Sequence, residues 1–224
     1  MTTIGRYSLT AALVMPQPTL EEVTVVHERI FRLSQSCPGS VFGVASVDPW
    51  LDETAYREEA EKCLSDYRFV AIKLHPLGHN ISPLSPLCEK VYQVAAEYGV
   101  PVIVHTGLGT PHSLPALMID PAKRYPEVTF ILAHAGFAVY STEAIVAAKY
   151  CPNLILEPSW CPTFMVRGMI DQIGSDRVIM GSDHLNNLPV ELAKYNAIGL
   201  SERQFRDIMF DNPNRIFNLR LEKT

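Results

Sequence analysis

The sequence predicts an α/β fold in which short parallel strands alternate with helices. Seven short apolar runs recur along the chain, and their starts lie roughly 24 to 34 residues apart, the length of a strand plus a crossover helix. Several runs are almost continuously apolar and rich in β-branched residues, which is typical of parallel strands buried on both faces. Nothing between them resembles a linker, so we expect one domain over residues 1–224.

The individual elements follow in order from these patterns. The expected strands are residues 7–16, 41–49, 69–76, 101–107, 128–136, 153–160 and 177–184. The segments between them carry helix start and stop signals, namely capping residues before an apolar face and a glycine after it. Helices are expected to begin at Thr19, Ser85, Ser141 and Ser201, and one is expected to end at Gly99.

The composition narrows the range of partners. The net charge is −5, with no long run of either sign, and no apolar stretch is long enough to span a bilayer. This argues against nucleic acid or a membrane and leaves a small molecule as the expected partner. The five cysteines include no C-x-x-C pair, which favours reduced thiols and a cytoplasmic location.

Seven alternating units fit two architectures, an open doubly wound sheet and a (β/α) barrel. No G-x-G-x-x-G motif follows the first run and no P-loop motif is present, so the usual evidence for nucleotide binding is missing. Polar residues stand at the carboxyl ends of several runs instead. Both architectures place their functional sites there.

Four runs end in side chains that bind metals or move protons. Because strand side chains alternate between two faces, Lys73 and His75 share one face of their run. His105, His134 and Asp183 end three further runs. The sequence therefore predicts that three imidazoles and one carboxylate meet at one rim of the sheet.

Each of these residues also has a simpler explanation when taken alone. A histidine at a strand end is usually a hydrogen-bonded structural residue, and Asp183 could cap a turn. Alternation turns His184 away from the centre, and solvation explains His27 and His79. Taken together, however, imidazoles and a carboxylate at one rim form a ligand set for zinc or a similar divalent ion. Such an ion lowers the pKa of its bound water to about 7 and so supplies hydroxide.

The sequence resembles the amidohydrolase-related family of metal-dependent TIM-barrel enzymes, from about Tyr7 onward. The resemblance is carried by the succession VAIKLHP, GVPVIVHTG, YPEVTFILAHAG, PNLILEPSW, SDRVIMGSDH and DNPNRIFNL. It implies a TIM-type barrel with a divalent metal at its mouth, zinc first and manganese as the alternative. It further implies that His105 and Asp183 are metal ligands, and that His134 is either a ligand or the acid/base beside the metal-bound water. Asp183 would also accept a proton.

The pocket around this metal would be lined by residues from several strand ends and loops. The expected substrate contacts are Lys73, His75, His112, Glu157 and Trp160, with Phe137 beside Trp160 as an apolar wall. Some relatives carry a carboxylated, metal-bridging lysine where Lys73 stands, but a structural or substrate-contacting role is the expectation here. A solvated loop position is the alternative for His112.

The chain departs from the family pattern at its beginning. Family members begin with a strand that ends in H-x-H, and this sequence contains no H-x-H. Its first apolar run matches the family's second strand, so the expected barrel is incomplete, with seven strands and the first βα unit absent. Two consequences are weaker metal binding and two open sheet edges. The gap could be filled by N-terminal residues, by a partner chain in a homo-oligomer, or by nothing.

Three functions remain under consideration. The leading one is a metal-dependent hydrolase of a small ester, lactone or amide, because metal-activated water suits this ligand set. The second is a metal-dependent decarboxylase, which a cationic carboxylate clamp in the pocket would favour; Lys73 and Arg167 are the candidate cations. The third is a degenerate barrel without catalysis that serves a binding or structural role.

Overall fold

The computed structural model describes residues 3–17 and 22–222, so the predicted helix start at Thr19 lies outside the described residues. Six of the seven predicted runs contain a strand. These are β1 (Ala12–Val14), β2 (Val41–Gly43), β3 (Ile72–Leu74), β4 (Val102–His105), β5 (Phe130–Ala133) and β6 (Leu154–Glu157). The seventh run forms a single parallel bridge, between Val178 and Leu156 of β6.

All strand pairs are parallel and follow chain order. β1 pairs with β2, and β3 to β6 form one four-stranded sheet. A bridge between Ala45 and Ile72 joins the end of β2 to β3. The strands therefore run side by side from β1 to Val178, and the ring is not closed between these two ends.

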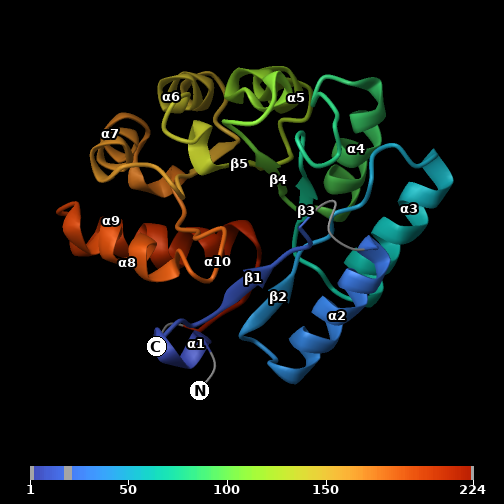
Figure 1. Ribbon diagram of the computed structural model, residues 1–224, viewed down its shortest axis with the longest axis horizontal. Coiled ribbons are helices and arrows are strands. Elements are labelled where there is room, and N and C mark those ends of the chain that lie inside the picture. The colour runs from blue at the N-terminus through green and yellow to red at the C-terminus, as the bar shows by residue number, and fades with distance from the viewer. Residues whose placement is uncertain (1–2, 18–21, 223–224) are drawn as a thin grey trace.

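Helices lie outside the strands in an arc (Figure 1). They are α1 (Thr3–Arg6), α2 (Val23–Ser36), α3 (Glu53–Glu61), α4 (Glu89–Tyr98), α5 (Ile119–Arg124), α6 (Ser141–Tyr150), α7 (Thr163–Ile173), α8 (Leu188–Ala197), α9 (Glu202–Arg206) and α10 (Asn212–Ile216). No helix among the described residues is long and apolar enough to cross a membrane. All five cysteines are free thiols, as expected.

Most predicted helix ends are confirmed. The Ser85 hydroxyl accepts a hydrogen bond from the Leu87 N–H, and Gly99 ends α4 with a left-handed φ of 63°. Ser201 forms a capping box with Gln204. Ser141 does begin α6, but its hydroxyl donates to the Ala135 carbonyl oxygen instead of capping the helix.

Alternation along the strands divides the core into two clusters. The larger cluster lies between the strands and the helices and includes Ile72, Leu74 and Val104. The smaller cluster fills the interior and takes the intervening residues, such as Ala71 and Ile103. Burial on both faces is what the continuous apolar runs predicted.

The C-terminal segment 216–221 completes the interior cluster. Phe217 and Leu219 are buried in it, and Leu13 of β1 packs against the same cluster. The segment passes from α10 along β1 towards α1 (Figure 1). The interior beside the open edge is thus packed by the C-terminal segment, which was not among the three expected ways of filling the gap. Coverage of that edge in a homo-oligomer stays a prediction.

Candidate active site

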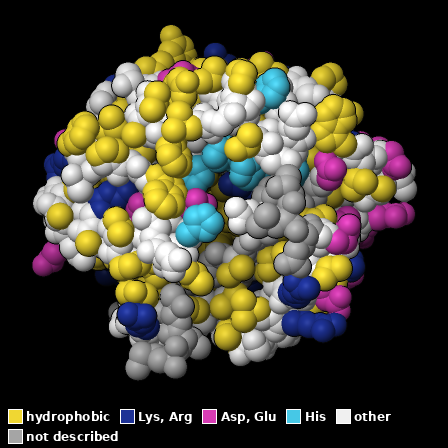
Figure 2. Space-filling view, in the orientation of Figure 1, with side chains coloured by type: hydrophobic (Ala, Val, Ile, Leu, Met, Phe, Trp, Pro, Cys, Tyr) yellow, Lys and Arg dark blue, Asp and Glu magenta, His cyan; other side chains and the backbone are white. Residues whose placement is uncertain are grey.

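Three of the predicted site residues reach the rim by strand alternation alone. Lys73 and His75 follow the interior residue Ala71 at steps of two, and His105 follows Ile103 in the same way. The rings of His75 and His105 stack at 4.4 Å with an interplanar angle of 7°. Figure 2 shows histidine side chains gathered around a hollow near the middle of this face.

His134 reaches the rim by a turn rather than by alternation. β5 ends at Ala133, whose side chain belongs to the interior cluster, so the next residue of a regular strand would face outward. His134 and Ala135 instead adopt left-handed backbone conformations, with φ of 66° and 39°. This turn brings the His134 ring to 5.0 Å from the His105 ring.

The hydrogen bonds of His105 leave one nitrogen with a bare lone pair. Its Nε2 lies 3.2 Å from the Leu108 carbonyl oxygen, which can only accept, so Nε2 carries the proton. Its Nδ1 is then unprotonated, and it is buried without a hydrogen-bond partner in the part of the chain that the structure describes. A buried polar atom without a partner costs free energy unless a ligand satisfies it.

His134 is held by a chain of two further side chains. The Ser159 hydroxyl donates to Glu157 Oε2 at 3.0 Å, so it accepts from His134 Nδ1–H at 2.7 Å. The His134 Nε2 therefore keeps a lone pair. Burial, followed by the charge of Lys73, lowers the pKa of His134 to about 2, so its ring is neutral.

His75 differs from its two neighbours because its Nδ1 is occupied. The Gly78 backbone N–H donates to this nitrogen at 3.0 Å, which leaves the proton on Nε2. Burial and the nearby Lys73 charge lower the pKa of His75 to about 3. His75 therefore offers a hydrogen-bond donor to the pocket and not a metal-binding lone pair.

Lys73 is a buried lysine whose ammonium has no partner among the described residues. It is 6% exposed, and its Nζ makes no hydrogen bond or ion pair with the described residues. Burial lowers its pKa to about 8, while Asp183 and Glu157 act in the opposite direction. Beside it, Ser46 follows the interior residue Val44 by two positions, and its buried hydroxyl has no hydrogen-bond partner within residues 3–17 and 22–222. The alternation that selected Lys73 would have selected Ser46 as well.

Asp183 lies past the end of regular strand structure, with a left-handed φ of 61°. Its Oδ2 accepts a hydrogen bond from Trp160 Nε1 at 2.9 Å and lies 3.8 Å from His184 Nε2. The expectation that alternation turns His184 away is wrong, because the positive φ at Asp183 breaks that alternation. His184 lines a cavity of about 620 Å³ together with Trp160, Leu185, Asn186 and Asn187.

The other predicted pocket residues fall into different surroundings. Glu157 is buried, and its oxygens accept from the backbone N–H groups of His134 and Ser159 as well as from the Ser159 hydroxyl. A side chain at Gly181 would come within 2.6 Å of Glu157 Oε1, which explains the glycine before Asp183. The Phe137 and Trp160 rings stack at 6.2 Å and 25°.

His112 and Arg167 make their hydrogen bonds with residues outside this group. His112 lies in a short 3-10 helix (Pro111–Ser113) after β4, where its backbone N–H donates to Thr110 Oγ1, and its contact with substrate stays a prediction. Arg167 lies on the surface of α7, where it pairs with Asp171 and donates to the Gly199 carbonyl oxygen. Arg167 is therefore not a pocket cation.

The rim fits a divalent metal ion in the kind of donor it offers. His105 Nδ1 and His134 Nε2 each keep a lone pair, and Asp183 Oδ1 has no hydrogen-bond partner among the described residues. Two imidazoles and a carboxylate with open positions are typical of catalytic metal sites. The ligand atoms of these three residues do not all lie within 4.8 Å of one another.

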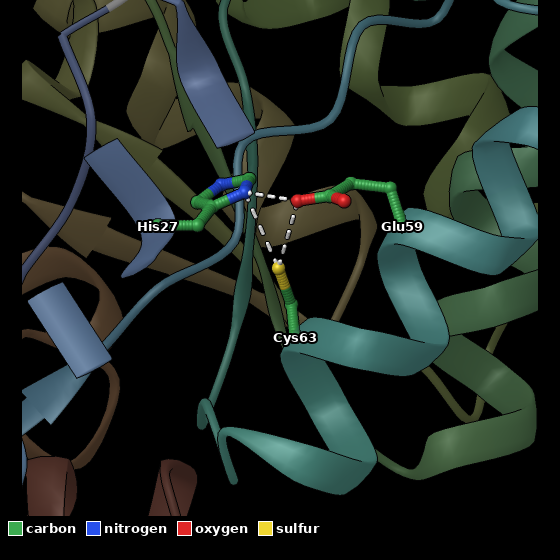
Figure 3. A group of neighbouring side chains, drawn as sticks. All are labelled: His27, Glu59 and Cys63. Atoms are coloured by element: carbon green, nitrogen blue, oxygen red, sulfur yellow. Dashed lines mark hydrogen bonds and ion pairs between the residues drawn. The ribbon is translucent and has the colours of Figure 1, made fainter. Parts of the chain in front are cut away.

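Among the described residues, one other group does meet that distance, namely His27, Glu59 and Cys63 (Figure 3). His27 Nδ1 lies 2.8 Å from Glu59 Oε1 and 3.3 Å from Cys63 Sγ. However, the Ser46 backbone N–H donates to His27 Nε2 at 2.9 Å, so the ring proton is on Nδ1 and no lone pair remains for a metal. The group is a buried hydrogen-bonded cluster, and the expectation that His27 is solvated is wrong because its side chain is 0% exposed.

The chain is similar to solved TIM-barrel structures along nearly its whole length. An uncharacterised TIM-barrel protein from Bordetella bronchiseptica aligns with a TM-score of 0.83 and 15% identity, over 97% of this chain and 80% of that one. 5-Carboxyvanillate decarboxylase from Sphingomonas paucimobilis aligns with a TM-score of 0.79 and 12% identity, over 96% of this chain and 81% of that one. Dihydroxybenzoic acid decarboxylase from Polaromonas sp. JS666 was solved with bound manganese and the inhibitor 2-nitroresorcinol. It aligns with a TM-score of 0.77 and 14% identity, over 98% of this chain and 85% of that one.

These likenesses confirm the predicted TIM-type α/β architecture, here with an unclosed ring. No curated protein matches the sequence significantly. The family model described as amidohydrolase matches residues 20–219, which is most of the 224 residues. The chain therefore belongs to the amidohydrolase family.

Proposed function

We propose that this protein is a metal-dependent decarboxylase of a small aromatic carboxylic acid. Membership of the amidohydrolase family supports metal chemistry at the barrel mouth. Several structurally similar proteins are decarboxylases of hydroxylated benzoic acids, and some were solved with manganese. This support favours the second of the predicted functions over the hydrolase that the ligand set alone had favoured.

One observation carries the proposal: Lys73 is buried, and its ammonium makes no hydrogen bond or ion pair with the other described residues. An ion out of water is costly unless it is paired. A substrate carboxylate would supply the missing charge, and the adjacent Ser46 hydroxyl could donate a second hydrogen bond to it. A neutral ester, lactone or amide offers Lys73 no such partner.

The remaining pocket residues suit an aromatic ring. Phe137 and Trp160 present stacked faces, which favour offset or edge contacts with another ring. His75 Nε2–H is a donor for a ring hydroxyl or the carboxylate. The Asp183 carboxyl group would deliver the proton that the ring carbon takes up as its bond to the carboxylate breaks and carbon dioxide leaves.

A divalent metal would be held by His105 Nδ1, His134 Nε2 and Asp183. Manganese is the leading candidate because it is the ion in the similar decarboxylases, and zinc stays a prediction. When bound, it would supply Lewis-acid polarisation and a template for the substrate oxygens. The Ser159–Glu157 chain would hold His134 in the tautomer that this role needs.

The test is a product assay with purified protein and added manganese. We expect carbon dioxide release from one or more hydroxybenzoates, such as 2,6-dihydroxybenzoate or 5-carboxyvanillate, and its loss on chelation and in Asp183→Asn. Hydrolysis of a parallel panel of esters and lactones without carbon dioxide release would overturn the proposal in favour of the hydrolase. If the protein showed neither decarboxylation nor hydrolysis, the non-catalytic barrel would be the remaining explanation.

A further inference from the structure

The loop that carries Trp160 is fastened by a buried ion pair on α8. Glu191 is 1% exposed and Lys194 is 7% exposed, and Lys194 Nζ lies 2.5 Å from Glu191 Oε2. The same ammonium donates to the carbonyl oxygens of Pro158 at 3.2 Å and Cys161 at 2.8 Å. It therefore ties down both ends of the loop 158–161.

Glu191 fixes the middle of that loop. Its Oε1 accepts from the Trp160 backbone N–H at 2.9 Å and from Asn187 Nδ2 at 3.1 Å. Trp160 has a left-handed φ of 65°, which is rare for a bulky residue and persists only where surrounding contacts enforce it. The buried pair supplies those contacts.

The side chain of Trp160 in turn makes a hydrogen bond to Asp183. Its indole N–H donates to Asp183 Oδ2 at 2.9 Å, while Asp183 Oδ1 stays without a partner among the described residues. Asp183 lies beyond the last strand bridge and is 38% exposed at its side chain, so neither strand pairing nor burial fixes the carboxylate. Among the described residues the indole N–H is the one hydrogen-bond donor to this carboxylate, and His184 Nε2 lies farther away, at 3.8 Å from Oδ2.

We propose that Trp160 is a positioning residue for Asp183, and that the buried Glu191–Lys194 pair holds Trp160 in place. The inference rests on the proposed function, because it treats Asp183 as the metal-binding carboxylate. Hydrogen-bond partners of metal ligands set their orientation, and their removal typically lowers metal affinity about 10- to 100-fold. Trp160 thus has two contacts in the pocket: its ring stacks on Phe137, and its N–H binds the proposed metal ligand Asp183.

The first test needs no metal or substrate. The chain has two tryptophans, so a proton–nitrogen correlation spectrum contains two indole signals, which Trp50→Phe assigns. Trp50 is the matched control, because its indole N–H donates to the His79 carbonyl oxygen at 2.8 Å. We expect Asp183→Asn and Glu191→Gln each to shift the Trp160 signal and leave the Trp50 signal in place. An unmoved Trp160 signal in Asp183→Asn overturns the proposal.

Glu191→Gln leaves Lys194 without its charged partner and could fail to fold. In that case the double variant Glu191→Gln/Lys194→Met, which removes both buried charges, replaces it in the same measurement. A Trp160 signal that stays in place in the double variant refutes the part assigned to the ion pair.

The second test measures manganese affinity by calorimetry. Trp160→Phe keeps an aromatic ring but loses the indole N–H together with the five-membered ring, so we expect about 10-fold weaker binding, while the fold is retained. Trp50→Phe should bind manganese as the wild type does. Equal affinity of Trp160→Phe and wild type would contradict positioning. If wild type bound no manganese, the proposed function would fail, and the indole shifts alone would decide whether Trp160 orients Asp183.

Discussion

The barrel mouth and the cluster between α2 and α3 hold similar side chains in opposite hydrogen-bonding states. In the His27–Glu59–Cys63 cluster both ring nitrogens of His27 are used, one by Ser46 and one by Glu59. At the mouth, neither His105 Nδ1 nor the Lys73 ammonium has a hydrogen-bond partner among the described residues. The His27–Glu59–Cys63 cluster has the more closely spaced ligand atoms, yet the hydrogen bonds of His27 within the protein are already complete.

This difference shows that proximity of ligand atoms is a poor guide to function in this protein. Close approach in the cluster comes from hydrogen bonds that already satisfy its atoms. At the mouth the possible ligand atoms do not all lie within 4.8 Å of one another, and His105 Nδ1 and Ser46 Oγ have no partner among the described residues. Such atoms cost stability unless a bound group satisfies them. Functional sites commonly carry such a cost.

The largest expected effect is on manganese affinity, which should fall when the barrel mouth is changed and stay the same when the His27–Glu59–Cys63 cluster is changed. His105→Asn removes a proposed ligand nitrogen, so manganese affinity should fall by more than about 100-fold, beyond what loss of an outer partner causes. Glu59→Leu should leave the affinity unchanged while lowering the free energy of unfolding by about 1–3 kcal/mol, because His27 Nδ1–H loses its acceptor. Calorimetric titration and urea denaturation measure both. Loss of manganese binding in Glu59→Leu would reverse the assignment.

A smaller effect is expected from Lys73→Met. Loss of a charge-assisted hydrogen bond of about 1.5–3 kcal/mol should lower kcat/KM roughly 10- to 100-fold. The change should appear mainly in KM, because the ammonium holds the carboxylate before the reaction as well as during it. The melting temperature should rise, since an unpaired buried charge is replaced by an apolar side chain.

Arg167→Gln is the control for Lys73→Met, because it removes an exposed cation that lies outside the pocket. Its KM should match that of the wild type. A normal KM in Lys73→Met together with a lower melting temperature would make Lys73 a structural residue.

The smallest effect concerns pH and the cluster. Burial lowers the pKa of His27 below its ordinary value of 6.5, despite the opposing effect of Glu59. Above that pH both the folded and the unfolded state hold neutral His27, and its contribution to stability is complete. As the pH falls below 6.5, only the unfolded state binds the proton, so stability falls until the lower folded pKa is reached, by up to about 1.4 kcal/mol per pH unit.

Urea denaturation of metal-free protein at several pH values between 7 and 5 measures this loss. His27→Gln should show a shallower loss than wild type, because the other histidines contribute equally to both. Identical pH dependence in the two proteins would mean that His27 titrates alike in the folded and unfolded states.

The sequence by itself determined the strand runs and the residues that alternation places on the inner face. Lys73, His75 and His105 follow from a period of two along buried strands, and Ser46 would have followed from the same rule. The family was also readable, because the HTG, AHAG and GSD elements stand in order at strand ends.

Only the tertiary structure decided the rest. His134 and Asp183 reach the rim through left-handed turns, which no strand periodicity encodes. The free nitrogen of His105 depends on which neighbour occupies the other. His27 is buried, and its ring nitrogens are bonded to Ser46, after β2, and to Glu59 of α3. In the sequence, Glu191 and Lys194 have the spacing of an ordinary exposed ion pair on a helix. In the structure they are buried, because α8 packs against the loop 158–161. Local patterns set which way a side chain leaves the backbone, but its hydrogen-bond partners come from segments distant in the sequence.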